Sequence, residues 1–177
     1  MPTTLLEGLL SGITHPVLGL DHLTFMVAIG LAAALAPASL LIIACFVAAS
    51  LAGTVVHAAN FDFAYSEQLV AISVILAGLL LLTGYGSKRS IWLPFALLAG
   101  LVHGYAFGET ILWANLDVTA AYTAGVLGVL VAITVAIMLV ISKVLKVSDA
   151  QSIPVRAAGG VFAMIGIYLL IGLLHGD

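Results

Sequence analysis

The chain is 177 residues long, with 63% hydrophobic residues, 7% charged residues and a formal net charge of −3. So few charged side chains cannot form a polar surface, which excludes an ordinary soluble domain, and the acidic balance excludes a basic nucleic-acid-binding surface. We therefore predict an all-α polytopic membrane protein, with residues 1–177 forming a single transmembrane domain in the lipid bilayer.

In chain order, the first apolar segment is Leu5–Thr14, which is too short to cross a membrane. We expect it to form a short helix or a re-entrant segment. Longer apolar stretches follow, separated by residues that favour turns, and they predict six transmembrane helices. Their expected bounds are Leu20–Leu35, Leu40–Ala59, Glu67–Gly84, Trp92–Phe107, Thr119–Leu145 and Val155–Leu174.

The basic residues predict the orientation of these helices. Lysine and arginine are enriched on the cytoplasmic side of membrane proteins, and all five fall at one end of the predicted bundle. They are Lys88, Arg89, Lys143, Lys146 and Arg156. Both termini are therefore predicted to be extracytoplasmic, in a multi-pass protein of the bacterial inner membrane. An N-terminus on that side normally needs a translocation signal, so we expect the natural precursor to carry a cleaved signal peptide.

Most acidic and histidine side chains are predicted to lie at the opposite, outer end of the bundle, and Asp149 is the one inner acid. The outer set is His15, Asp21, His22, His57, Asp62, Glu67, His103, Glu109, Asp117 and His175. Membrane insertion rules explain the positions of lysine and arginine, but they say little about acids and nothing about histidine. This sorting predicts that the outer end attracts or binds a ligand.

The motif HPVLGLDH, His15–His22, contains two imidazoles and a carboxylate. On a continuous helix the two histidines would stand roughly 10 Å apart along the axis, too far apart for one metal ion. Pro16 and Gly19 favour a break that would bring His15 back toward His22. Imidazole with carboxylate suits nickel, cobalt, zinc or copper ions, with Asp21 either binding the metal or orienting an imidazole.

A second motif, HGYAFGE, runs from His103 to Glu109 at the outer end of the fourth predicted span. Gly104 and Gly108 would either permit close helix approach, or unwind the helix end so that His103 and Glu109 converge. Glu67 begins the third span, where a carboxylate also complements the helix dipole.

Purely structural roles are open for each of these residues. Asp21 would cap a helix, His22 would be an interfacial histidine, and Met26 favours core packing over a role as a soft ligand. His57 and His175 are better explained as interfacial side chains than as ligands. Cys45 has no cysteine partner and is assigned no chemistry.

HPVLGLDH matches the H-P-x-x-G-x-D-H signature of the HupE/UreJ family of nickel or cobalt permeases, which the whole chain resembles. HGYAFGE resembles the family's second signature, roughly H-G-x-A-x-G-x-E, but Tyr105 and Phe107 occupy variable sites that often hold histidine. Glu109 also comes one residue early, so the resemblance carries over more firmly to His103 than to Glu109.

The resemblance implies a permease that takes up a divalent metal ion, most simply nickel or cobalt, with zinc and copper as alternatives. The predicted metal-binding residues are His15, Asp21, His22, Glu67, His103 and Glu109. No ATP-binding or nucleophile-elbow motif is present in the sequence, so uptake is expected to be ATP-independent and not enzymatic, with no prosthetic group.

The inner half of the metal's path has only hydroxyl groups as candidates. They are Ser50, Thr54, Ser73, Thr83, Thr123 and Thr134. Glycines of the last two spans predict close packing among spans five and six, or across a subunit interface in a homo-oligomer. They are Gly125, Gly128, Gly159, Gly160, Gly166 and Gly172.

Two other functions are compatible with the same residues. One is an intramembrane zinc-dependent hydrolase, in which His15, His22 and His103 hold the ion and Asp21 or Glu109 transfers the proton. In that case Ser11 and Ser66 would polarise an oxyanion. The other is a metal-sensing or assembly subunit that binds the ion without moving it.

Overall fold

A computed structural model describes residues 2–37, 39–59, 64–109 and 115–175, which excludes Asp62 of the predicted outer set. Every regular element in these ranges is helical, which confirms the all-α prediction. The α-helices are α1 (Leu5–Leu18), α2 (Leu20–Leu35), α3 (Ser39–Ala58), α4 (Ser66–Leu82), α5 (Arg89–Glu109), α6 (Leu116–Leu139) and α7 (Ile153–His175). A short 3₁₀ turn, Tyr85–Ser87, precedes α5, and a π-helical turn, Val140–Val144, extends α6.

The helix bounds lie within a few residues of the predicted spans, and α1 continues to Leu18, past the predicted end at Thr14. Among the described residues, four helices are long and apolar enough to cross a membrane: α3, α5, α7 and α6 with its π-helical extension. The α1–α2 pair, bent by 76°, qualifies together as either one broken span or a re-entrant loop. With 17 residues, α4 is a shorter apolar helix. The number of six transmembrane helices therefore stays a prediction.

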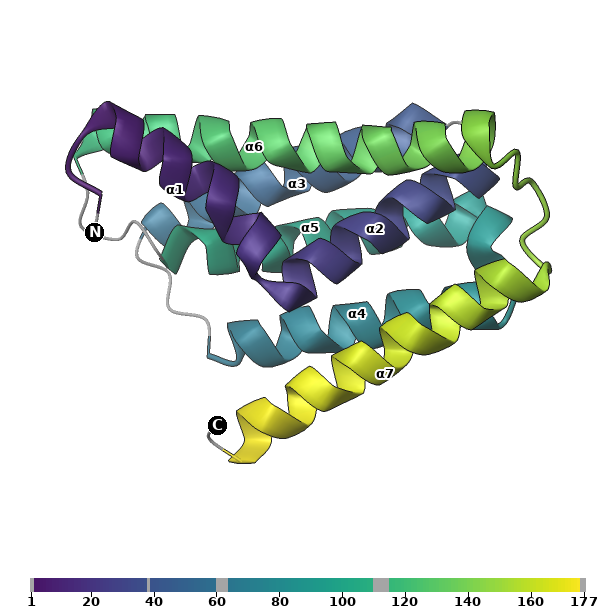
Figure 1. Ribbon diagram of the computed structural model, residues 1–177. Helices are drawn as coiled ribbons and strands as arrows, with labels where there is room; N and C mark the ends of the chain where they lie inside the picture. The colour runs from purple at the N-terminus through teal and green to yellow at the C-terminus, as the bar shows by residue number, and fades with distance from the viewer. Residues whose placement is uncertain (1, 38, 60–63, 110–114, 176–177) are drawn as a thin grey trace.

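The helices form three closely packed pairs around α2: α3 with α5, α4 with α7, and α1 with α6 (Figure 1). Glycine makes this packing close, because a Cβ on Gly104 of α5 would collide with the Ser50 carbonyl of α3. Gly12 of α1 has the same relation to the Tyr122 carbonyl of α6. Backbone approach of this kind is common in membrane helix pairs.

The prediction that spans five and six pack closely on each other is wrong for the described residues, because half of those glycines approach other helices instead. Gly125 of α6 contacts α1, whereas Gly159 and Gly166 of α7 contact α4. Nothing lies within 4 Å of a Cβ built on Gly128 or Gly172. An approach to a second copy of the chain stays a prediction.

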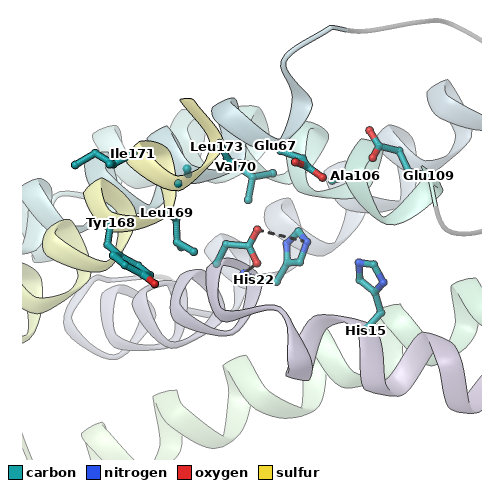
Figure 2. A pocket seen from close by; sticks show the side chains of 13 residues that line it. His15, His22, Glu67, Val70, Ala106, Glu109, Tyr168, Leu169, Ile171 and Leu173 are labelled. Atoms are coloured by element: carbon teal, nitrogen blue, oxygen red, sulfur yellow. Dashed lines mark hydrogen bonds and ion pairs between the residues drawn. The ribbon is translucent and has the colours of Figure 1, made fainter. Parts of the chain in front are cut away.

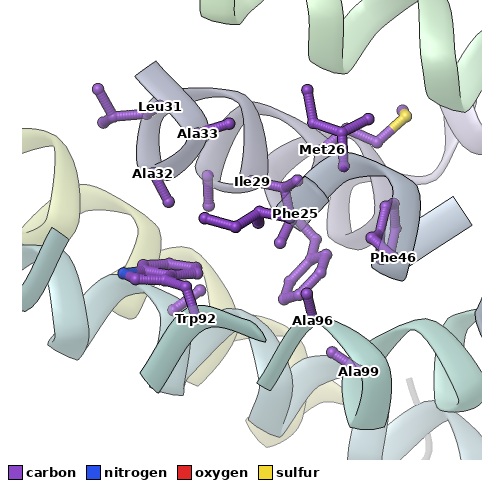
Figure 3. Close-up of a cluster of buried hydrophobic side chains, with 14 of the residues drawn as sticks. Phe25, Met26, Ile29, Leu31, Ala32, Ala33, Phe46, Trp92, Ala96 and Ala99 are labelled. Atoms are coloured by element: carbon purple, nitrogen blue, oxygen red, sulfur yellow. The ribbon is translucent and has the colours of Figure 1, made fainter. Parts of the chain in front are cut away.

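Aromatic and aliphatic side chains of α2, α3 and α5 form the centre of the core (Figure 3). Phe25, Phe46 and Trp92 are fully buried there. Met26 is also fully buried in this cluster, as its core-packing interpretation predicts. These contacts hold α2 in the middle of the bundle, so that its N-terminal end faces the ends of α4 and α5.

Successive long helices run in alternating directions, and both termini lie at the same end of the bundle (Figure 1). The basic residues lie at the other end: Lys88 and Arg89 at the start of α5, Lys143 and Lys146 at the end of α6 and just after it, and Arg156 in the first turn of α7. The ends therefore differ in charge as predicted, and the assignment of the basic end to the cytoplasm stays a prediction.

Candidate metal site

The HPVLGLDH motif contains the junction between α1 and α2. Gly19 lies between the two helices with φ −73° and ψ 112°, and the helix axes differ by 76°. The Gly19 N–H donates to the His15 carbonyl at 3.1 Å, and the Gly19 carbonyl accepts from the Leu23 N–H at 2.9 Å. The predicted break is present, and both peptide groups of Gly19 are hydrogen-bonded despite the bend.

This break brings His15 and His22 together, with 5.6 Å between their ring centroids. Asp21 Oδ1 accepts a hydrogen bond from the His22 backbone N–H at 2.7 Å. Asp21 Oδ2 lies 3.9 Å from His22 Nε2, which is too long for a hydrogen bond. The capping interpretation of Asp21 is wrong, because the N-cap of α2 is Gly19 and Asp21 lies in the first turn, where it accepts from the N–H of the next residue while its second oxygen faces the His22 ring.

A cavity of about 710 Å³ lies at this junction, between α2, α4, α5 and the C-terminal part of α7. Its lining includes His15, Asp21, His22, Glu67 and Glu109. In Figure 2, the labelled histidines and glutamates surround the same space. An adjoining cavity of about 460 Å³ is lined by four of these five residues, without Glu109, and also by Ser11. Five of the six predicted metal-binding residues thus lie around one space.

The two glutamates come from neighbouring helix ends. Glu67 lies in the first turn of α4, and Glu109 is the last residue of α5. Glu109 Oε1 accepts a hydrogen bond from the Ser66 hydroxyl at 2.7 Å. Both glutamate side chains are exposed. Their carboxylates give the cavity a negative charge that would attract a cation.

His103, the sixth predicted residue, lies behind the cavity and not in its lining. It is completely buried, and its Nδ1 lies 2.9 Å from Nδ1 of His22. Its Nε2 lies 2.9 Å from the hydroxyl of Ser73 on α4. Both ring nitrogens of His103 are therefore engaged within the protein.

The second motif remains helical through Glu109, so the unwinding interpretation of Gly104 and Gly108 is wrong. Close approach is the correct alternative, because Gly104 meets the Ser50 carbonyl and Gly108 meets the Cβ of His57. His103 consequently faces the interior, and it is separated from Glu109 by more than one helical turn.

Among the residues that the structure describes, no three His, Cys, Asp or Glu side chains are close enough together to form a complete metal-binding group. The cavity is wide, with its donor groups on different walls. Its lining nevertheless combines imidazole nitrogens with carboxylate oxygens, the ligands suited to borderline divalent ions. The arrangement is that of an acidic vestibule leading to the His22 ring.

The remaining outer histidines are outside the cavity lining. His57 is 7% exposed, and its ring packs edge-on against Tyr105 with centroids 4.5 Å apart. His175 is exposed, and its Nδ1 contacts the Ile171 carbonyl at 2.8 Å. His57 is therefore buried and not interfacial, whereas His175 is exposed at a helix end as predicted; that neither binds metal stays a prediction.

The hydroxyl groups predicted to line an inner path all donate to a carbonyl of their own helix. They are Ser50, Thr54, Ser73, Thr83, Thr123 and Thr134. None of them lines either cavity described above. The route through the inner half of the bundle stays a prediction.

Two features of the site have no signal in the sequence. One is the pairing of Ser73 with His103, because these residues are far apart in the chain and on different helices. The other is the wall formed by Tyr168–Leu173 of α7. Both depend on how helices approach one another, which a hydropathy pattern does not specify.

Comparison with known proteins places these motifs in a family. The sequence profile of the family described as HupE / UreJ protein matches residues 2–169. Protein HupE of Rhizobium leguminosarum bv. viciae is 29% identical over 168 residues, which cover 94% of this chain and 86% of that protein. No solved structure matches the chain significantly. The match over nearly the whole length establishes that this chain belongs to the HupE/UreJ family.

Proposed function

We propose that the chain is an ATP-independent permease for uptake of a divalent transition metal ion, with Ni²⁺ or Co²⁺ as the cargo. The observation that carries this proposal is the cavity lined by His15, Asp21, His22, Glu67 and Glu109. Membership of a family whose signature this chain resembles supports the same function. The apolar helices around the cavity support a location in the membrane.

In this proposal the metal ion first meets the exposed carboxylates of Glu67 and Glu109, which concentrate cations at the outer end. It then reaches His15, His22 and Asp21 at the helix break. Because the imidazole and carboxylate ligands lie on separate walls of the wide cavity, they would bind the ion one after another. Each step would bind the ion weakly enough for it to move on. His103 contributes by supporting His22 from behind.

The test is metal flux into liposomes that contain the purified protein. Radioactive Ni²⁺ is added outside, and its accumulation is followed with and without His22→Ala. The substitution removes the imidazole that joins the cavity to the interior, so we expect flux to fall to the level of empty liposomes. Circular dichroism and size-exclusion chromatography report whether the variant remains folded.

Two outer-end variants serve as matched controls. His175→Ala removes an exposed histidine outside the cavity, and Asp117→Asn neutralises an acid at the start of α6 whose carboxylate accepts from the Val118 N–H. Both should retain the flux of the unchanged protein. Undiminished flux in folded His22→Ala would disprove the proposed role of this residue.

The hydrolase alternative requires three histidine nitrogens around one zinc ion. It is less well supported, because both nitrogens of His103 already contact His22 and Ser73. The two functions also predict different measurements. A hydrolase turns over a lipid or peptide, whereas a permease moves metal without a chemical change in any substrate.

A further inference from the structure

Three polar side chains form a continuous chain of contacts behind the cavity. His22 of α2 meets His103 of α5 through their Nδ1 atoms, at 2.9 Å. His103 Nε2 meets the Ser73 hydroxyl of α4 at 2.9 Å, and that hydroxyl donates to the Val70 carbonyl at 2.7 Å. The chain therefore crosses three helices and ends at a backbone acceptor.

The surroundings of this chain leave few other partners. His103 is fully buried, and the Phe25 ring centroid lies 4.3 Å from that of the imidazole. Phe46 and Phe107 also flank it, with centroids 6.0 and 6.5 Å away. In such apolar surroundings an N–H group without an acceptor is costly, so the contacts of the chain decide where its protons lie.

The direction of each hydrogen bond follows from the carbonyl at the end. A carbonyl oxygen only accepts, so the one hydroxyl proton of Ser73 points to Val70. Ser73 Oγ is then the acceptor for His103, and His103 carries its proton on Nε2. Because a neutral imidazole has a single N–H, Nδ1 of His103 is the acceptor for Nδ1–H of His22.

We infer that Ser73 and His103 are positioning residues that fix the tautomer of His22, leaving a bare lone pair on Nε2 at the cavity. His22 lines the cavity, and its Nε2 is 3.9 Å from Asp21 Oδ2, beyond hydrogen-bonding distance. A metal ligand of this kind is commonly oriented by a hydrogen bond at its other nitrogen. The consequence for metal binding rests on the proposed function.

The opposite arrangement has a clear cost. If His22 carried its proton on Nε2, His103 would have to donate from Nδ1, and its Nε2 would be bare. The Ser73 hydroxyl would then have to serve both Val70 and His103 with one proton. One of the two short contacts would lose its hydrogen bond in a buried site.

The tautomers are measured by ¹⁵N NMR of the metal-free protein, labelled in its histidines, at a pH where the imidazoles are neutral. The protonated and bare nitrogens of an imidazole have well-separated ¹⁵N shifts, and His22→Ala and His103→Ala spectra assign the rings. We expect His22 protonated on Nδ1 and His103 on Nε2. A His22 ring protonated on Nε2 would overturn the inference, whether or not the protein transports metal.

Ser73→Ala tests the origin of this preference. Without the hydroxyl acceptor, we expect a substantial population with the proton of His22 on Nε2, and a Ni²⁺ affinity lower by about 10- to 100-fold, the usual effect of losing such a supporting contact. Ser50→Ala is the matched control for the spectrum, because Ser50 is a buried helical serine that donates to the Phe46 carbonyl. It should leave both tautomers unchanged.

Two outcomes separate this inference from the proposed function. Tautomers that are identical in Ser73→Ala and the unchanged protein would refute a positioning role for Ser73. Correct tautomers in a protein that neither binds nor moves Ni²⁺ would support the hydrogen-bond chain and reject the permease. If Ser73→Ala does not fold, the spectrum of the unchanged protein still decides the tautomer of His22.

Discussion

Substitution of Gly19 by alanine tests the geometry of the helix break directly. A Cβ at this position would lie 2.9 Å from Asp21 Oδ1 and 2.9 Å from His22 Cδ2. Contact between carbon atoms is normally about 3.5–4.0 Å, so the His22 ring would have to shift by roughly 0.6–1.1 Å. The backbone itself is not strained, because φ −73° and ψ 112° are accessible to alanine.

A ring shift of this size is enough to break the hydrogen bond between His22 and His103. Their Nδ1 atoms are 2.9 Å apart, and a displacement of roughly 0.6 Å along that line would reach the limit of a useful hydrogen bond. Leaving a buried polar group unsatisfied costs about 1–3 kcal/mol. That cost lowers the stability of the folded protein, and because the lost contact orients the His22 imidazole, we expect Ni²⁺ affinity to fall about 10- to 100-fold.

The measurement is isothermal titration calorimetry of Ni²⁺ with the purified Gly19→Ala protein, alongside its thermal melting curve. The expected combination is weaker binding in a protein that still folds but melts a few degrees lower, because the unsatisfied polar group is present with or without Ni²⁺. Gly128→Ala is the control, because nothing lies within 4 Å of a Cβ on Gly128; it should leave Ni²⁺ affinity unchanged and should not lower the melting temperature. Unchanged Ni²⁺ affinity in Gly19→Ala would refute the reasoning that the break positions His22.

Two further predictions concern packing and protonation. Gly104→Ala places a methyl group against the Ser50 carbonyl, so the α3–α5 pair must separate; we expect a lower melting temperature, or no folded protein, and a normal melting curve would contradict the close approach. Metal uptake should weaken as the external pH falls, because protonation removes the lone pairs of imidazole ligands such as His15 and His22. Flux measured from pH 8 to pH 4 checks this, and flux that rises toward low pH would contradict imidazole ligation.

The sequence predicts those parts of this protein that depend on local chemistry. Hydropathy locates the helices to within a few residues, and Pro16 with Gly19 predicts the break that joins His15 to His22. The two motifs and Glu67 also identify five residues that line one cavity.

The remaining features depend on which helix faces lie together. His103 was predicted as a ligand, and its residue type suits that role, but α5 stays helical and turns the imidazole toward His22 and Ser73. The sequence gives Ser73 only as one hydroxyl in an apolar helix. Likewise, α4 resembles a spanning segment in composition, and its 17 residues leave the number of spans unsettled by length alone.

The bend at Gly19 is held by the backbone itself. The Gly19 N–H and carbonyl groups have partners at 3.1 and 2.9 Å, so this corner is fixed by hydrogen bonds within the chain. An arriving cation therefore has no backbone to reorganise around His15 and His22, and little of its binding energy goes into ordering them. Discrimination among divalent ions of similar charge must then come from the ligand atoms and from the cost of removing each ion's water shell, because the geometry of the corner is the same for every ion.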